Sequence, residues 1–254
     1  SNHNVAIGHA AGTAVTTGIN NTLMGGLAGD ALTDADANVA VGVNALGADT
    51  LGSRSIAIGM NALEVQNFTS ATNVYNVAVG FGAGAEITTG IHNTLVGGLA
   101  GDALTVGHRN VAVGKDALKT NIGGAKNIAI GEGSLSTFNS GSSASDTYNT
   151  AVGHFAGGAV TTGTHNNFFG GLAGDALTDG AANVAIGFAA LSSDTRGHSS
   201  VAIGHGALGA QNFTSTTDTF NTAVGKLAGT AVTTGKKNTF IGGLVCDEHV
   251  NGEN

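Results

Sequence analysis

The sequence lacks proline and tryptophan, has a single cysteine, and is poor in charge, with only 10% of its 254 residues being Asp, Glu, Lys or Arg. The low charge and the 41% share of hydrophobic residues exclude an ordinary disordered chain. The absence of proline excludes collagen, although the chain contains 43 Gly. Cys246 has no second cysteine to pair with, so the fold does not depend on an internal disulfide.

Basic residues and long apolar runs are also scarce. Nine Lys and Arg stand against seventeen Asp and Glu, giving a net charge of −8, so we expect no nucleic-acid binding by phosphate neutralisation. The apolar stretches are interrupted by Gly, Asn and Thr, so we expect no transmembrane helix and no membrane insertion. The first repeat begins at Asn4, and we expect any targeting segment to lie outside this sequence.

A short motif, Asn-x-apolar-apolar-Gly-x-x-Ala, recurs fourteen times with slight drift. Its first residues are Asn4, Asn21, Asn38, Ser55, Asn76, Asn93, Asn110, Asn127, Asn149, Asn166, Asn183, Ser200, Asn221 and Asn238. Successive starts are 17 residues apart, except for gaps of 21, 22 and 21 after every fourth repeat. We therefore predict a single repeat domain over residues 1–254, built of the blocks 4–75, 76–148 and 149–220 and a partial block 221–254.

The motif predicts an all-β fold. Val5-Ala6-Ile7 has the composition of a short strand, and the Gly that follows it in every repeat marks a corner. A second Gly near the end of most repeats marks another corner, so each repeat forms one coil with two short strands. The sequence predicts a parallel β-solenoid, a narrow two-sheet β-roll of about fourteen 17-residue turns. The leading Asn is either a turn residue that caps its own backbone or part of an Asn ladder along the axis.

The two apolar positions in the middle of the motif suggest that both faces of the strand are buried. The fourth position, as in Ile7, Met24, Val41 and Ile58, is always apolar and is expected to face the core. The third position then points outward, and it is never polar. A sheet with one wet face would carry polar residues there, so we predict that another copy of the chain covers it. The predicted oligomer interface contains Ala6, Leu23, Ala40, Ala57, Leu95, Phe168 and Phe240.

Several repeats carry the form Val/Ile-Ala-Ile-Gly, as in Asn4–Gly8, Ser55–Gly59 and Ser200–Gly204. Together with Asn-Thr-Ala-Val-Gly at Asn149–Gly153 and Asn221–Gly225, they resemble the head repeats of trimeric autotransporter adhesins and the glycine-rich repeats of phage tail fibres and bacterial surface fibres. The resemblance covers nearly the whole chain. It implies a homotrimer of parallel β-rolls displayed outside the cell, on the cell surface or on a virion.

Candidate chemistry is weak. Histidines such as His9 and His154 share their repeat positions with Phe81 and Lys226, which is typical of solvated turns, so we expect no catalytic residues and no cofactor. Asp30 follows a Gly-Gly-Leu-Ala-Gly sequence similar to calcium-binding repeats, and Asp102 and Asp175 occupy the same place in later blocks. One carboxylate per block cannot supply six oxygen ligands, so these aspartates are at most weak metal candidates. Threonine pairs occur on one turn in four, too rarely for a continuous ice-binding array.

The insertions at 64–75, 136–148 and 209–220 are the better functional lead. They contain half of the aromatic residues, namely Phe68, Tyr75, Phe138, Tyr148, Phe213 and Phe220. Loops on a rigid scaffold often carry binding sites, and aromatics beside amides suit a glycan or a protein receptor. Alternatively, each aromatic folds back over the edge of the roll.

These observations favour an extracellular fibre or adhesin segment, in which a rigid roll presents loops to a host or surface ligand. The alternative is a purely structural, self-assembling filament subunit. An ice-binding protein and a carbohydrate-active enzyme are less favoured.

Overall fold

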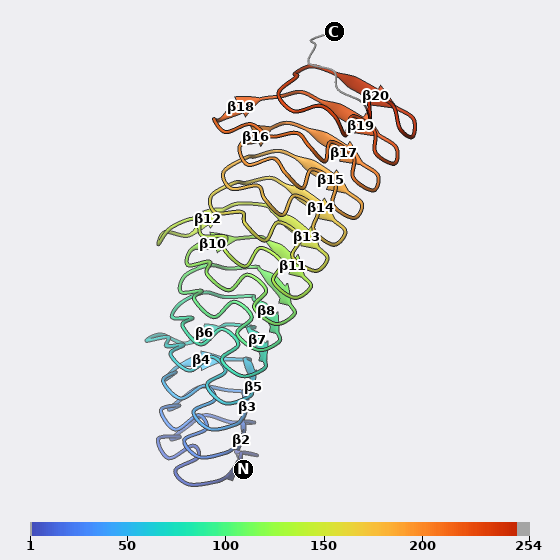
Figure 1. The fold of residues 1–254 in the computed structure, drawn as a ribbon. Coiled ribbons are helices and arrows are strands. Elements are labelled where there is room, and N and C mark those ends of the chain that lie inside the picture. The colour runs from blue at the N-terminus through green and yellow to red at the C-terminus, as the bar shows by residue number, and fades with distance from the viewer. Residues whose placement is uncertain (1, 248–254) are drawn as a thin grey trace. The chain divides into compact units, whose positions relative to one another are not determined.

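The computed structural model describes residues 2–247, which are all-β and form a parallel β-solenoid of about fourteen turns (Figure 1). Since residues 2–247 contain no helix, none of them lies in a helical segment able to cross a membrane. The chain divides into two compact units, one of Ser1–Lys126 with Ser140–Asp146 and one of Asn127–Asn139 with Thr147–Asn254. The assignment of residues 1–254 to a single domain stays a prediction.

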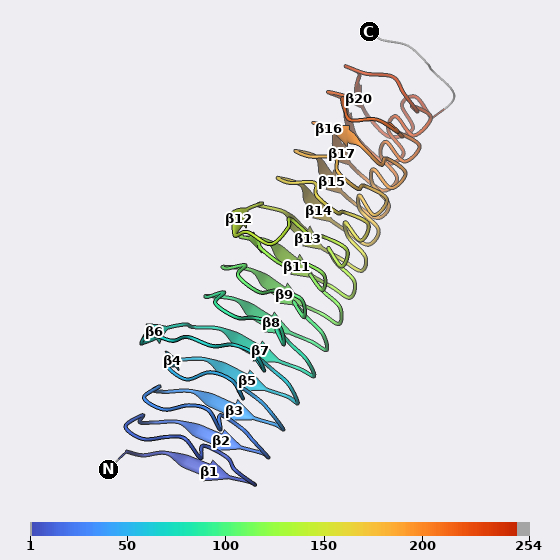
Figure 2. The same cartoon turned by 90° about the vertical axis from the view of Figure 1, so that its left-hand side faces the viewer.

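The first unit stacks seven parallel strands of three residues each (Figure 2). They are β1 (Val5–Ile7), β2 (Thr22–Met24), β3 (Val39–Val41), β5 (Ile56–Ile58), β7 (Val77–Val79), β8 (Thr94–Val96) and β9 (Val111–Val113). Paired residues are 17 apart in sequence, as in Ala6 with Leu23, and 21 apart across the insertion, as in Ala57 with Ala78. Shorter pairs join β4 (Gly52–Ser53) to β6 (Thr72–Asn73) and β10 (Gly124–Ala125) to β12 (Ser145–Asp146).

The second unit repeats this arrangement. Its seven parallel strands are β11 (Ile128–Ile130), β13 (Thr150–Val152), β14 (Asn167–Phe169), β15 (Val184–Ile186), β17 (Val201–Ile203), β19 (Thr222–Val224) and β20 (Thr239–Ile241). One short pair joins β16 (Gly197–His198) to β18 (Thr217–Asp218). In the described residues of both units, the rest of each turn consists of bends and tight turns, so two-residue strand pairs stand where a second full sheet was expected.

The side chains of the strands face the opposite way from the prediction. The third motif position points into the solenoid, so five of the predicted interface residues are buried within their own chain: Leu23, Ala40, Ala57, Leu95 and Phe168. Ala6 and Phe240 are more accessible only because they lie on the end strands β1 and β20. The fourth position points outward, and the side chain of Ile7 is 55% exposed. The prediction of this inward face, and of the oligomer interface derived from it, is therefore wrong.

The physical reason for the reversed orientation is a packing match inside each turn. Where the third position is Leu23, Leu95 or Phe168, the ninth position is Gly, and a Cβ on Gly29 would come within 2.8 Å of the Leu23 side chain. Where the third position is Ala, as in Ala40, the ninth is often a buried Leu such as Leu46. In these turns the two positions share one core space, which places the third-position side chain inside. Where Ala78 is combined with Gly84, Leu95 of the next turn fills the space, since a Cβ at Gly84 would lie 2.7 Å from it.

The leading Asn residues bridge the turns from inside the solenoid. The side-chain NH₂ of Asn21 donates to the carbonyl of Ala35 in its own turn, at 2.8 Å. Its Oδ1 accepts from the backbone NH of Asn38 in the next turn, at 2.9 Å. The same pair of bonds recurs at Asn183, which is fully buried. Each side chain thus acts both as a cap for its own turn and as a link to the next, so the two interpretations of the motif combine.

The Gly that follows each strand is required by geometry. At Gly25 the backbone has a φ of +138°, and a Cβ there would lie 2.5 Å from the carbonyl oxygen of Gly42 in the next turn. A side chain is excluded both by the dihedral angle and by the close approach of the neighbouring backbone. The corner therefore sets how closely adjacent turns stack.

Candidate functional site

The outer face of the long strands is apolar and exposed. The second and fourth motif positions point outward, and in the first unit Ile7, Met24 and Ile58 are among the exposed large hydrophobic residues. Phe169 and Ile186 are their counterparts in the second unit. Because the strands pair in register, the fourth-position side chains form an apolar column along each unit, whereas the second-position column also contains polar residues such as Thr22, Thr94 and Asn167. Contiguous exposed apolar surface of this kind marks an interaction site.

The aromatic residues of the insertions divide into two groups. Phe68, Phe138 and Phe213 are buried, and Phe138 is completely inaccessible. These three are interior plugs, so the interpretation of them as contact residues is wrong. Tyr75, Tyr148 and Phe220 are about half exposed and remain available for contact, with Tyr75 at 48%.

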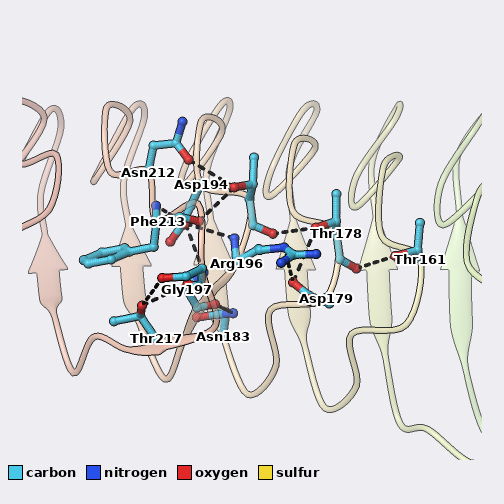
Figure 3. Close-up of polar contacts among 12 residues, drawn as sticks. Thr161, Thr178, Asp179, Asn183, Asp194, Arg196, Gly197, Asn212, Phe213 and Thr217 are labelled. Atoms are coloured by element: carbon cyan, nitrogen blue, oxygen red, sulfur yellow. Dashed lines mark hydrogen bonds and ion pairs between the residues drawn. The ribbon is translucent and has the colours of Figure 1, made fainter.

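In two of the three blocks, a buried polar network holds the phenylalanine plug in place. In the second unit, the Oδ1 of Asp194 accepts from the backbone NH groups of Gly197 and Phe213, both at 3.0 Å (Figure 3). Gln211 donates to the other carboxylate oxygen at 2.5 Å. In the first unit Asp49 makes the equivalent bonds, including one from the backbone NH of Phe68. The aspartate pins the start of the insertion, so it has a structural role.

The exposed tyrosines lie in a column of corner residues, each directly before a motif start. The corner residues share a positive φ of 46–65° and are His3, Asn20, Ala37, Arg54, Tyr75, His92, Arg109, Lys126, Tyr148, His165, Ala182, Ser199, Phe220 and Lys237. We call Arg54, Tyr75, His92 and Arg109, on four consecutive turns of the first unit, the corner ladder. Backbone bonds align it: the NH of His92 donates to Val74, and that of Arg109 donates to Ile91.

The side chains of the corner ladder stack along the solenoid axis. The rings of Tyr75 and His92 lie 5.7 Å apart at an interplanar angle of 15°. On the other side the guanidinium of Arg54 lies 5.7 Å from the centre of the Tyr75 ring and donates to its hydroxyl at 3.3 Å. A second stack pairs Tyr148 with His165 at 5.5 Å in the other unit. The ladder was not recognised from the sequence because the insertion separates Arg54 from Tyr75 by 21 residues rather than 17.

The weak metal candidates do not come together. Among residues 2–247 there is no group of three His, Cys, Asp or Glu side chains that could hold a metal ion. Asp30 lines an open groove of about 300 Å³ with Glu64 and five neutral residues. Burial raises the pKa of Asp175 above its ordinary value. Burial also raises the pKa of Asp102, with Lys119 opposing the change and Glu86 and Asp116 adding to it.

Threonine hydroxyls form longer runs than the spacing of the threonine pairs predicts. Thr161, Thr178 and Thr195 follow one another on successive turns (Figure 3). Each hydroxyl donates to a backbone carbonyl of the next turn, and Thr16 and Thr33 do the same in the first unit. These hydroxyls are engaged in holding turns together, which disfavours an ice-binding surface.

No protein-family model matches this chain, and no curated protein or solved structure is significantly similar to it.

Proposed function

We propose that the chain is a rigid segment of an extracellular fibre or adhesin, which assembles with copies of itself through the outer face of its sheet and presents its corners to a surface ligand. The observation that carries this proposal is the pair of outward-facing columns at the fourth motif position, which is apolar in all fourteen turns, and at the second, which is apolar in eight of them. They are exposed in the single chain, whereas the third-position residues are already buried.

The size of this face is at the low end for an interface between copies. Seven strands at about 4.8 Å spacing and three residues in width cover roughly 300 Å² in each unit, so the two units together offer roughly 600 Å². One partner of a stable complex contributes about 800 Å². The columns also repeat at the same spacing in every copy, so two or three chains can pack in matching register. A parallel homotrimer, as the adhesin resemblance implies, would bury this face on every chain.

Sedimentation equilibrium at micromolar concentration tests the assembly. We expect the parent chain to sediment as a trimer. The double variant Met24→Glu/Ile58→Glu places two charges on the outer face and should dissociate the trimer into monomers, because an interface buries unpaired charge at high cost. The matched control Thr69→Glu/Ser70→Glu adds the same charge to an exposed insertion and should stay trimeric.

A stable parent monomer would refute the proposal, as would a trimer that tolerates both double variants equally. Electron microscopy of the same samples separates discrete trimers from growing filaments. Filaments would favour the purely structural subunit over the adhesin.

A further inference from the structure

The corner column differs in charge from the rest of the chain. Its fourteen residues include four Lys or Arg, three His and three aromatics, and no Asp or Glu, in a protein with seventeen acidic residues and a net charge of −8. A column free of acidic residues on an acidic protein provides a local positive potential along the corners of each unit.

The cations of the corner ladder are available to a ligand. Arg54, His92 and Arg109 are exposed, and within residues 2–247 neither arginine takes part in an ion pair. The acidic residue Asp36, one turn before Arg54, accepts a bond from the backbone NH of Ile19 at 2.8 Å. At the next corner after Arg109, Lys126 is in an ion pair with Asp146.

Contacts between consecutive turns hold these groups side by side. The ring of Tyr75 lies 5.7 Å from the guanidinium carbon of Arg54 and 5.7 Å from the ring of His92, and the Tyr75 side chain is 48% exposed. A guanidinium beside an aromatic ring carries several N–H donors, which suits binding of a carboxylate or sulfate. The corner ladder therefore presents the side chains of Arg54, His92 and Arg109 within four consecutive turns.

We propose that the corner ladder binds an acidic polysaccharide through its carboxylate or sulfate groups. The ladder repeats at the turn spacing of about 4.8 Å, which is close to the length of one pyranose ring in an extended glycan. Successive acidic sugars can therefore meet successive corners, and many weak contacts along one polymer add up to tight binding. Phosphates in each strand of B-form DNA recur at about 3.4 Å and fall out of step with the turns.

This inference rests on the contact role proposed above and names the ligand. It is compatible with self-assembly because the corner column lies at the rim of the outer face, where interfaces stay polar and accessible.

Binding of the full chain to immobilised polysaccharides tests the proposal, with polygalacturonate as the carboxylate probe, dextran sulfate as the sulfate probe and unmodified dextran as the neutral control. We expect binding to at least one acidic probe, weakened by added salt. Arg54→Gln/Arg109→Gln should weaken it about tenfold or more. Tyr75→Leu should weaken it about threefold or more, because the stacking plane between Arg54 and His92 is lost.

The matched control is Lys226→Gln/Lys236→Gln, which lowers the net charge by the same amount at other positions and should change binding less than about twofold. Equal losses in the two double variants would show general charge attraction and overturn the proposal. Failure to bind either acidic probe, or tighter binding to duplex DNA, would also overturn it. Light scattering on the same samples separates this result from assembly. Ladder-dependent binding by a monomer would support the glycan site and refute the trimer. A trimer that does not bind would support the assembly and refute the glycan site.

Discussion

The packing match between the third and ninth motif positions predicts a strong coupling between Phe168 and Gly174. Phe168 is fully buried, and a Cβ on Gly174 would lie 2.5 Å from its ring. Phe168→Ala should lower the free energy of unfolding by about 3–5 kcal/mol, because no side chain at position 174 can fill the cavity. Gly174→Leu should lower it by about 1–3 kcal/mol through overpacking against the intact ring.

The double variant Phe168→Ala/Gly174→Leu recreates the Ala185–Leu191 combination found on the next turn. Leu191 has a φ of +55° and Gly174 a φ of +60°, so a leucine can adopt this backbone conformation. We expect the double variant to recover most of the loss, leaving a coupling energy of about 2 kcal/mol or more. Urea unfolding followed by far-ultraviolet circular dichroism measures all four proteins. Additive losses in the double variant would refute the shared core space.

Three further predictions concern single side chains. Asn183→Ala should lower the free energy of unfolding by about 1–3 kcal/mol for each buried backbone group that it leaves unpaired. The control Asn167→Ala removes an exposed side chain and should cost little. Equal urea midpoints for the two variants would contradict the bridging role of Asn183. Phe138→Ala should lower the melting temperature far more than Tyr148→Ala, because only the first leaves a cavity; the reverse order would contradict the plug. Burial raises the folded-state pKa of Asp175 above 3.8, so the folded chain binds this proton more tightly and gains stability as the pH falls through that raised pKa toward 3.8. Asp175→Asn should flatten that gain in a series of urea melts, and an unchanged pH profile would count against it.

The repeat made much of the fold predictable. The motif starts placed the strands at the second to fourth positions, where all fourteen long strands are found. The spacing of 17 residues also matches the strand register, as in the pairing of Val39 with Ile56. Regular spacing succeeds because each turn must bring the same backbone groups into line with those of its neighbours.

The orientation of the strands was not predicted because both faces are apolar. The fourth position was expected to face inward because it is always apolar, but Ile7 is 55% exposed and the third position, together with the ninth, lines the core. The sequence did contain the deciding signal: Leu23 is followed by Gly29, whereas Ala40 is followed by Leu46. That exchange of volume between two positions identifies which one shares the core.

The insertions were predicted only in part. Their position and exposed tyrosines could be foreseen, but the burial of Phe68 and Phe213 depends on Asp49 and Asp194 in the preceding turn. A carboxylate at a buried position that is apolar in most other turns, as in Leu32 and Ile87, is the signal for such an anchor.

The glycine corners and the asparagine side chains contact only the turns directly before and after their own. A four-turn block therefore contains all the bonds needed to continue the stack, and its gain or loss leaves the remaining turns with equivalent neighbours. Unequal recombination between blocks would change the number of exposed aromatic corners by one at each event, without any need for new sequence. The stack would thus lengthen or shorten by whole blocks while the structure of each turn stays the same.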